Sequence, residues 1–98
     1  MEKLGILINS TAHVQAAIQL ACAARETGKT VEIFLAARGV RILDNMNVSH
    51  LSTIGPVWVC SASLEAMGTG HALPLACRLV PPENLSEFLR SCDRHVVF

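Results

Sequence analysis

The sequence predicts a single α/β domain of three layers, with a five-stranded parallel sheet between helices. Short apolar runs, typical of strands buried on both faces, alternate with longer segments of helical character. The chain is 51% hydrophobic and 16% charged, which is the composition of an ordered protein. A chain of 98 residues can bury one core but not two, so we expect residues 1–98 to form one domain.

The first half of the chain predicts a strand, a helix and a second strand. Its first apolar run meets Asn9, Ser10 and Thr11, whose side chains are of the kind that cap helices. An alanine- and leucine-rich segment then runs for several turns to Gly28, and glycine is favoured just past a helix end. A second apolar run, a short helix and a segment of mixed signals, interpreted as a loop or ragged helical turn, follow. These elements span residues 3–9, 12–28, 30–37, 38–47 and 48–55 in turn.

The second half predicts two further strand–helix pairs and a closing strand. Ser61 or Ser63 caps the helix after the third strand, and Gly68 ends that helix. Pro81 and Pro82 open the last helix, because proline is tolerated in a helical first turn. These elements span residues 56–60, 61–68, 76–80, 83–92 and 95–98 in turn.

A binding crevice is expected at the carboxyl ends of the first and third strands. With a flavodoxin-like strand order of 2-1-3-4-5, the strand order reverses between those two strands, and ligands bind outside the sheet at that point. Asn9 and Ser10, at the end of the first strand, would then face Cys60 and Ser61 at the end of the third. His13, in the first turn of the first helix, is expected beside them.

Cys60 is the candidate catalytic residue. It lies where a strand ends and a helix begins, and the positive end of a helix favours the thiolate, which is the nucleophilic form. His13 could strengthen this effect as an imidazolium partner. The alternative is that Cys60 is an inert residue packed at the end of the strand, because free cysteine is among the most buried residue types. Cys22 and Cys92 are predicted to fill the core, and Cys77 to lie in the core or in an interface. The irregular spacing of the four cysteines indicates neither a zinc site nor a redox pair.

The composition disfavours several classes of partner and cofactor. Eight basic and eight acidic residues give zero net charge, so we expect no nucleic-acid partner and no membrane. No apolar run approaches the roughly 20 residues of a membrane span or the form of a secretory signal, and we expect a cytoplasmic protein with reduced thiols. His71 has no partners at metal-ligand spacing, and the "GTG" before it is too short for a phosphate loop. We therefore expect no metal and no cofactor.

Three stretches of the chain resemble the DsrE/DsrF-like family of small sulfur-relay proteins. The most telling element is a cysteine that closes the third strand before a helix ending in Met-Gly, with an acidic residue, here Asp93, just before the last strand. The resemblance implies a single α/β domain that assembles as a homo-oligomer or related hetero-oligomer. The helix after the cysteine departs from the family pattern, because it carries Glu65 and Met67 and no basic residue. The stretches that carry the resemblance are residues 4–40, 57–68 and 85–98.

The resemblance also implies a role for one residue. Cys60 would accept sulfur as a persulfide and pass it to a partner's cysteine. The protein would then act as a sulfurtransferase-like carrier, with sulfur donor and acceptor proteins as its partners.

The sequence is also consistent with a second function. The mean hydropathy of +0.42 is consistent with large oligomer interfaces, which are more hydrophobic than transient ones. The same fold would then serve as a non-catalytic oligomeric binding or assembly protein with a small-ligand crevice. A flavodoxin-like electron carrier is a weaker third hypothesis, because an aromatic content of 4% leaves little to sandwich a flavin ring.

Overall fold

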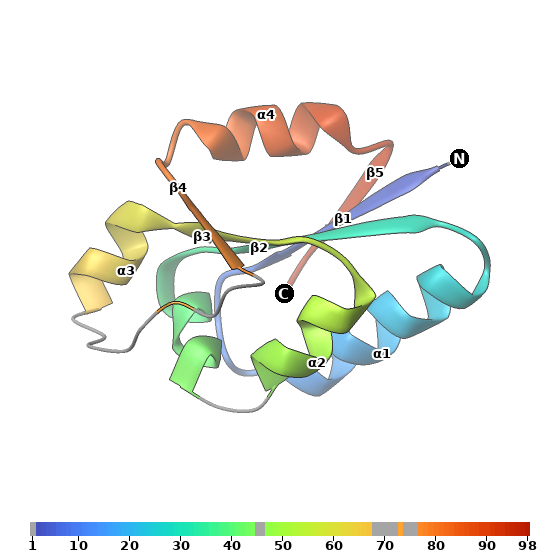
Figure 1. The fold of residues 1–98 in the computed structure, drawn as a ribbon, viewed down its shortest axis with the longest axis horizontal. Coiled ribbons are helices and arrows are strands. Elements are labelled where there is room, and N and C mark those ends of the chain that lie inside the picture. The colour runs from blue at the N-terminus through green and yellow to red at the C-terminus, as the bar shows by residue number, and fades with distance from the viewer. Residues whose placement is uncertain (1, 45–46, 68–72, 74–76) are drawn as a thin grey trace.

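The computed structural model describes residues 2–44, 47–67, 73 and 77–98 (Figure 1). All five predicted strands are confirmed. The segment interpreted as a loop or ragged turn is a regular helix, α2. The predicted end of the third helix at Gly68, and His71, lie outside the described residues. The elements are β1 (Lys3–Ile8), α1 (Val14–Glu26), β2 (Thr30–Leu35), the 3-10 helix η1 (Ala37–Asp44), α2 (Asn47–Ile54), β3 (Val57–Cys60), α3 (Ser61–Met67), β4 (Cys77–Val80), α4 (Asn84–Ser91) and β5 (Arg94–Val97).

The strands form one fully parallel sheet in the order β4-β3-β2-β1-β5. The predicted parallel sheet is confirmed, but the predicted order 2-1-3-4-5 is wrong. β2 pairs with both β1 and β3, so the chain adds strands in one direction as far as β4 and then returns to the far side of β1 as β5. The strand order therefore reverses between β1 and β5, not between the first and third strands.

The helices are divided unequally between the two faces of the sheet. Right-handed crossovers that move in the same direction put their helices on the same face, so α1, η1, α2 and α3 lie together. Only the connection from β4 to β5 moves back across the sheet, and it carries α4 to the opposite face (Figure 1). In the described part of the chain, α4 is the one helix that covers that face.

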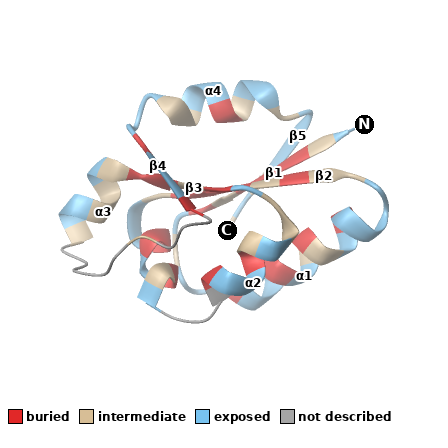
Figure 2. Ribbon diagram, viewed as in Figure 1, coloured by how far each residue is buried: buried red, intermediate tan, exposed pale blue. Residues whose placement is uncertain are grey.

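Two apolar clusters follow from this division. Successive strand residues point to opposite faces, so β1 to β4 each contribute side chains to both clusters, whereas β5 adds only Val96, to the larger one. The larger cluster lies under α1, η1 and α2, and most of the fully buried residues in Figure 2 belong to it. The smaller cluster lies under α4, where the Phe34 and Phe88 ring centroids are 5.2 Å apart, a favourable aromatic separation. Its buried members are Phe34, Cys60, Val80 and Phe88.

The helix α1 ends just before Gly28, as the sequence predicts. Gly28 has φ of +86°, in the left-handed region that glycine enters without steric cost. Its neighbour Lys29 donates its backbone N–H to the Ala24 carbonyl at 3.0 Å, which closes the C-terminus of α1 in a Schellman motif. The helix therefore stops where β2 must begin.

Candidate functional site

Cys60 is the last residue of β3, and α3 begins at the next residue, Ser61. Cys60 is a free thiol with 6% of its surface exposed. Its partner in the neighbouring strand is Val80, and its side chain packs with Phe34, Val80 and Phe88. Within the described ranges, no hydrogen bond reaches its sulfur. The thiol is thus enclosed by apolar side chains under α4 instead of facing an open crevice.

Asn9, Ser10 and His13 lie near the end of β1. The sequence predicted that Asn9, Ser10 or Thr11 would cap α1, but the N-cap residue is His13. The Asn9 backbone N–H donates to the Phe98 carbonyl at 2.9 Å, and the Ser10 hydroxyl accepts the Ala12 N–H at 3.5 Å. His13 occupies the N-cap position of α1, with no capping bond from its side chain. Sequence alone placed the polar side chains correctly near the strand end but not in their local roles.

The structure does not bring these residues to Cys60 and Ser61. β2 lies between β1 and β3, and neighbouring strands are about 4.8 Å apart, so the two strand ends are separated by roughly 10 Å of sheet. In the described part of the chain, no hydrogen bond joins the two groups. The shared crevice was expected from the wrong strand order, and the correct order removes the reason for it.

The turn from β2 into η1 takes the place beside the end of β3. The Ala37 backbone N–H donates to the Ser63 hydroxyl at 2.8 Å, so Ser63 binds this turn and does not cap its own helix. Ala37 has φ of +50°, a left-handed conformation that costs a non-glycine residue roughly 1–2 kcal/mol. Ala36 packs into the same cluster as Cys60. Sequence reasoning missed this turn because its position depends on the strand order.

Asp93, the acidic residue of the family resemblance, has a structural role here. Its carboxylate accepts the Lys3 backbone N–H at 2.6 Å, and its own N–H donates to the Lys3 carbonyl at 2.9 Å. This reciprocal pair fixes the start of β5 against β1.

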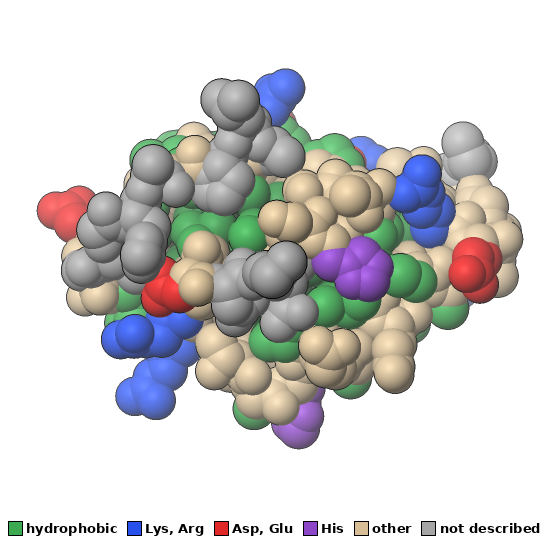
Figure 3. All heavy atoms as spheres, turned by 60° about the horizontal axis from the view of Figure 1, so that its bottom comes forward, with side chains coloured by type: hydrophobic (Ala, Val, Ile, Leu, Met, Phe, Trp, Pro, Cys, Tyr) green, Lys and Arg blue, Asp and Glu red, His purple; other side chains and the backbone are tan. Residues whose placement is uncertain are grey.

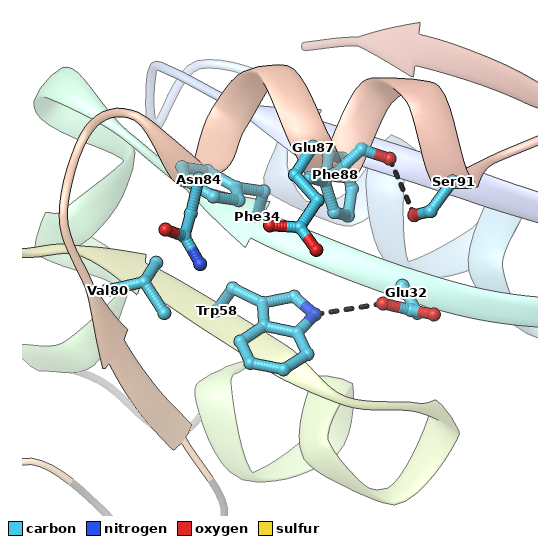
Figure 4. Close-up of a pocket in the computed structure, with 8 residues that line it drawn as sticks. All are labelled: Glu32, Phe34, Trp58, Val80, Asn84, Glu87, Phe88 and Ser91. Atoms are coloured by element: carbon cyan, nitrogen blue, oxygen red, sulfur yellow. Dashed lines mark hydrogen bonds between the residues drawn. The ribbon is translucent and has the colours of Figure 1, made fainter.

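A pocket of about 120 Å³ lies between α4 and the sheet, on the same face as Cys60 (Figure 4). Three of its residues, Phe34, Val80 and Phe88, also pack against the Cys60 side chain. The pocket and the thiol therefore share an apolar wall. The lining residues are Glu32, Phe34, Trp58, Val80, Asn84, Glu87, Phe88 and Ser91.

A polar network borders the pocket on the side of the sheet. Glu32 accepts a hydrogen bond from the Trp58 indole N–H at 2.9 Å and forms an ion pair with the Lys3 amine at 2.7 Å. The hydrogen bond and charge of Glu32 raise the pKa of Lys3. The Arg78 guanidinium lies over the Trp58 ring, 5.6 Å from its centroid. Glu32 is a charged residue within the otherwise apolar run of β2. This residue could have indicated from the sequence that one face of the sheet is incompletely covered.

The other cysteines have different surroundings. Cys77 is buried in the larger cluster, as predicted, and burial raises the pKa of its thiol. Cys92 follows α4 and is partly buried, and burial again is the main reason that its pKa is raised. Cys22 is partly exposed, and its sulfur lies 3.9 Å from the His50 Nε2 atom.

Two further kinds of feature were sought among the described residues. Within those ranges no group of three or more His, Cys, Asp and Glu side chains could hold a metal ion, and no helix is long and apolar enough to cross a membrane. On the face shown in Figure 3, charged side chains are scattered around hydrophobic ones.

Comparison with solved structures identifies the fold. The chain matches the crystal structure of the YchN protein from E. coli with a TM-score of 0.82 and 19% sequence identity, over 100% of both chains. The chain has the YchN fold. YchN is a DsrE/DsrF-like protein, so the family resemblance drawn from the sequence motifs is confirmed at the level of the fold. No family model matches the sequence, and no curated protein matches it significantly.

Proposed function

We propose that this protein is a sulfur-relay protein in which Cys60 carries sulfur as a persulfide and passes it to a partner thiol. The observation that carries the proposal is the position of Cys60 as the last residue of β3, directly before α3, in a chain with the YchN fold. The DsrE/DsrF-like family to which YchN belongs is associated with sulfur relay.

The chemistry balances without a redox cofactor. In loading, the Cys60 thiolate attacks the outer sulfur of a donor persulfide, a new S–S bond forms, and the donor's own S–S bond breaks. The donor leaves as a thiolate and takes up a proton from water. In unloading, an acceptor thiolate attacks the outer sulfur on Cys60, and Cys60 leaves as a thiolate. Both steps are exchange reactions at sulfur, with no net oxidation or reduction.

The burial of Cys60 implies that loading follows an opening of the structure. Phe88 is the buried residue of α4 and packs directly on the cluster that encloses the thiol. A short helix with so little buried surface belongs to the low-stability part of a fold, which opens without global unfolding. Displacement of α4 therefore exposes Cys60. A small donor such as inorganic polysulfide is expected to load the protein faster than a bulky one.

The partners that accompany this role are a second copy of the chain and donor and acceptor proteins. Support for self-association comes from the edge strands, where Leu79 of β4 is 50% exposed and Val97 of β5 is 52% exposed. An edge strand also carries unpaired backbone N–H and C=O groups, which can pair with a strand of another copy. Sedimentation velocity that shows a stable oligomer would support this part, and a strictly monomeric protein at high concentration would contradict it.

The relay is tested by following labelled sulfur from a low-molecular-weight persulfide to an acceptor thiol, with and without the protein. The wild type is expected to accelerate the transfer, and Cys60→Ala is expected to leave only the uncatalysed rate. Cys22→Ser serves as the matched control, because it removes a more exposed thiol on the opposite side of the sheet. Equal acceleration by the wild type and Cys60→Ala would contradict the proposal.

A second candidate function is a non-catalytic oligomeric binding protein with a small-ligand crevice. The pocket under α4 and the burial of Cys60 favour it. If this is the function, Cys60→Ala keeps oligomer formation and ligand binding unchanged, and neither protein transfers sulfur.

A further inference from the structure

We propose that the pocket between α4 and the sheet binds a small guanidinium compound, which pairs with the Glu87 carboxylate and stacks on the Trp58 indole. The site contains no part of the Cys60 side chain, so the inference goes beyond the sulfur-relay function and does not depend on it. It assigns a ligand class to a cavity that the sequence did not predict.

The size of the pocket limits the ligand. A volume of about 120 Å³ is several times the space that one water molecule needs. A guanidinium group with a short alkyl substituent suits such a space, which is smaller than the roughly 300–1,000 Å³ of pockets for drug-sized ligands. The aromatic and aliphatic walls from Phe34, Val80 and Phe88 suit the alkyl part.

Glu87 supplies the charge that the ligand must complement. The two carboxylates of the pocket come from opposite sides, Glu32 from β2 and Glu87 from α4. Glu32 is already paired with Lys3 and Trp58. Glu87 has no hydrogen bond or ion pair within the described residues, and Figure 4 shows its carboxylate directed toward Trp58. Glu87 is exposed, so its carboxylate can be reached from solvent, and a cation between Glu87 and the indole would pair with it.

Asn84 adds a second unpaired polar group. Its side-chain amide has no hydrogen-bond partner in the described part of the chain, and Figure 4 shows it directed into the pocket. The amide oxygen accepts hydrogen bonds and the amide nitrogen donates them. A guanidinium group carries five N–H donors in one plane, enough to reach both Glu87 and Asn84.

Trp58 favours guanidinium over ammonium. Planar guanidinium groups stack on aromatic faces, and tryptophan is the best cation–π partner. The structure already contains one such contact, since the Arg78 guanidinium lies 5.6 Å from the Trp58 ring centroid. Trp58 lines the pocket and Arg78 does not.

The test uses the fluorescence of Trp58, which is the single tryptophan of the chain. Methylguanidinium is titrated into the intact protein, and N-methylurea, a neutral molecule of nearly the same shape, is the control ligand. A saturable change in Trp58 emission with methylguanidinium, and none with N-methylurea at the same concentrations, is the expected result. Equal responses to both ligands, or no saturable response to methylguanidinium, would overturn the proposal.

Two matched variants locate the cation. Glu87→Gln removes the negative charge and is expected to weaken methylguanidinium binding about twofold to fivefold, the loss of one exposed ion pair. Glu83→Gln makes the same charge change four residues earlier, outside the pocket, and is expected to bind as the wild type does. Unchanged affinity in Glu87→Gln would overturn the assignment. Because Cys60→Ala should bind methylguanidinium normally, failure of this site and failure of sulfur transfer are separable.

Discussion

Replacing Cys60 with serine would exchange a buried thiol for a hydroxyl of nearly the same size in apolar surroundings. The thiol is 6% exposed and packs against Phe34, Val80 and Phe88. Because these side chains offer no hydrogen-bond partner, the hydroxyl would lose its contact with water and gain no partner among them. An unsatisfied buried hydroxyl costs about 1–3 kcal/mol, and we expect the free energy of unfolding to fall by that amount.

Alanine at the same position separates packing from polarity. Cys60→Ala removes one buried heavy atom without adding a polar group, so its expected cost is about 1 kcal/mol, comparable to the loss of one buried methyl group. The alanine variant is therefore the better choice for functional experiments, because a serine variant that lost activity could have lost it through partial unfolding.

Thermal and urea unfolding of the three proteins measure these costs. For a domain of this size, 1 kcal/mol shifts the melting temperature by about 4–8 °C, so Cys60→Ser should melt about 4–24 °C below the wild type. Cys22→Ser is the matched control, because its hydroxyl can bond His50 and the site is partly exposed. It should stay within about 0.5 kcal/mol of the wild type. Wild-type stability in Cys60→Ser would refute the apolar burial of this thiol.

Three further predictions concern other parts of the chain. Limited alkylation with a maleimide at neutral pH should modify Cys22 first, because the other thiols are buried or have a pKa raised by burial; peptide mapping that finds the first adduct elsewhere would contradict this. The pKa of Lys3 is raised above 10.5 by Glu32, so its small contribution to stability is fully present below about pH 10.5 and is lost as the pH rises through the raised value. Urea unfolding across that range should show the loss in the wild type and not in Lys3→Met. Gly39→Ala should destabilise the fold by about 1–3 kcal/mol or more, because the added methyl would lie 1.9 Å from the Ile8 carbonyl oxygen; an unchanged free energy of unfolding in urea would contradict this, because it would mean that η1 moves away from the end of β1 at no cost.

The elements of the fold could be predicted from the sequence because each strand is a short apolar run. The exception is α2, whose segment carries mixed local signals. It becomes helical because Val48 and Leu51 are buried in the larger cluster. Tertiary packing of this kind overrides weak local propensity.

The strand order could not be predicted from the sequence, and the crevice expected between the first and third strands was wrong for that reason. The five runs are similarly apolar, so nothing in them specifies which pairs with which. Placing Cys60 at the end of β3 needed only local pattern, whereas placing His13 beside it needed the order. The pocket was missed for the same reason, since Glu32 and Trp58 border a cavity beneath α4, the one helix on their face of the sheet in the described part of the chain.

The central claim is that sulfur is carried on Cys60, and intact-protein mass spectrometry after incubation with a persulfide donor tests it most directly. The wild type and Cys60→Ala are compared after circular dichroism has shown that both are folded. The account predicts a gain of one sulfur atom in the wild type, removed by a reductant and absent from Cys60→Ala. The same gain in both proteins, or no gain in the wild type, would contradict it.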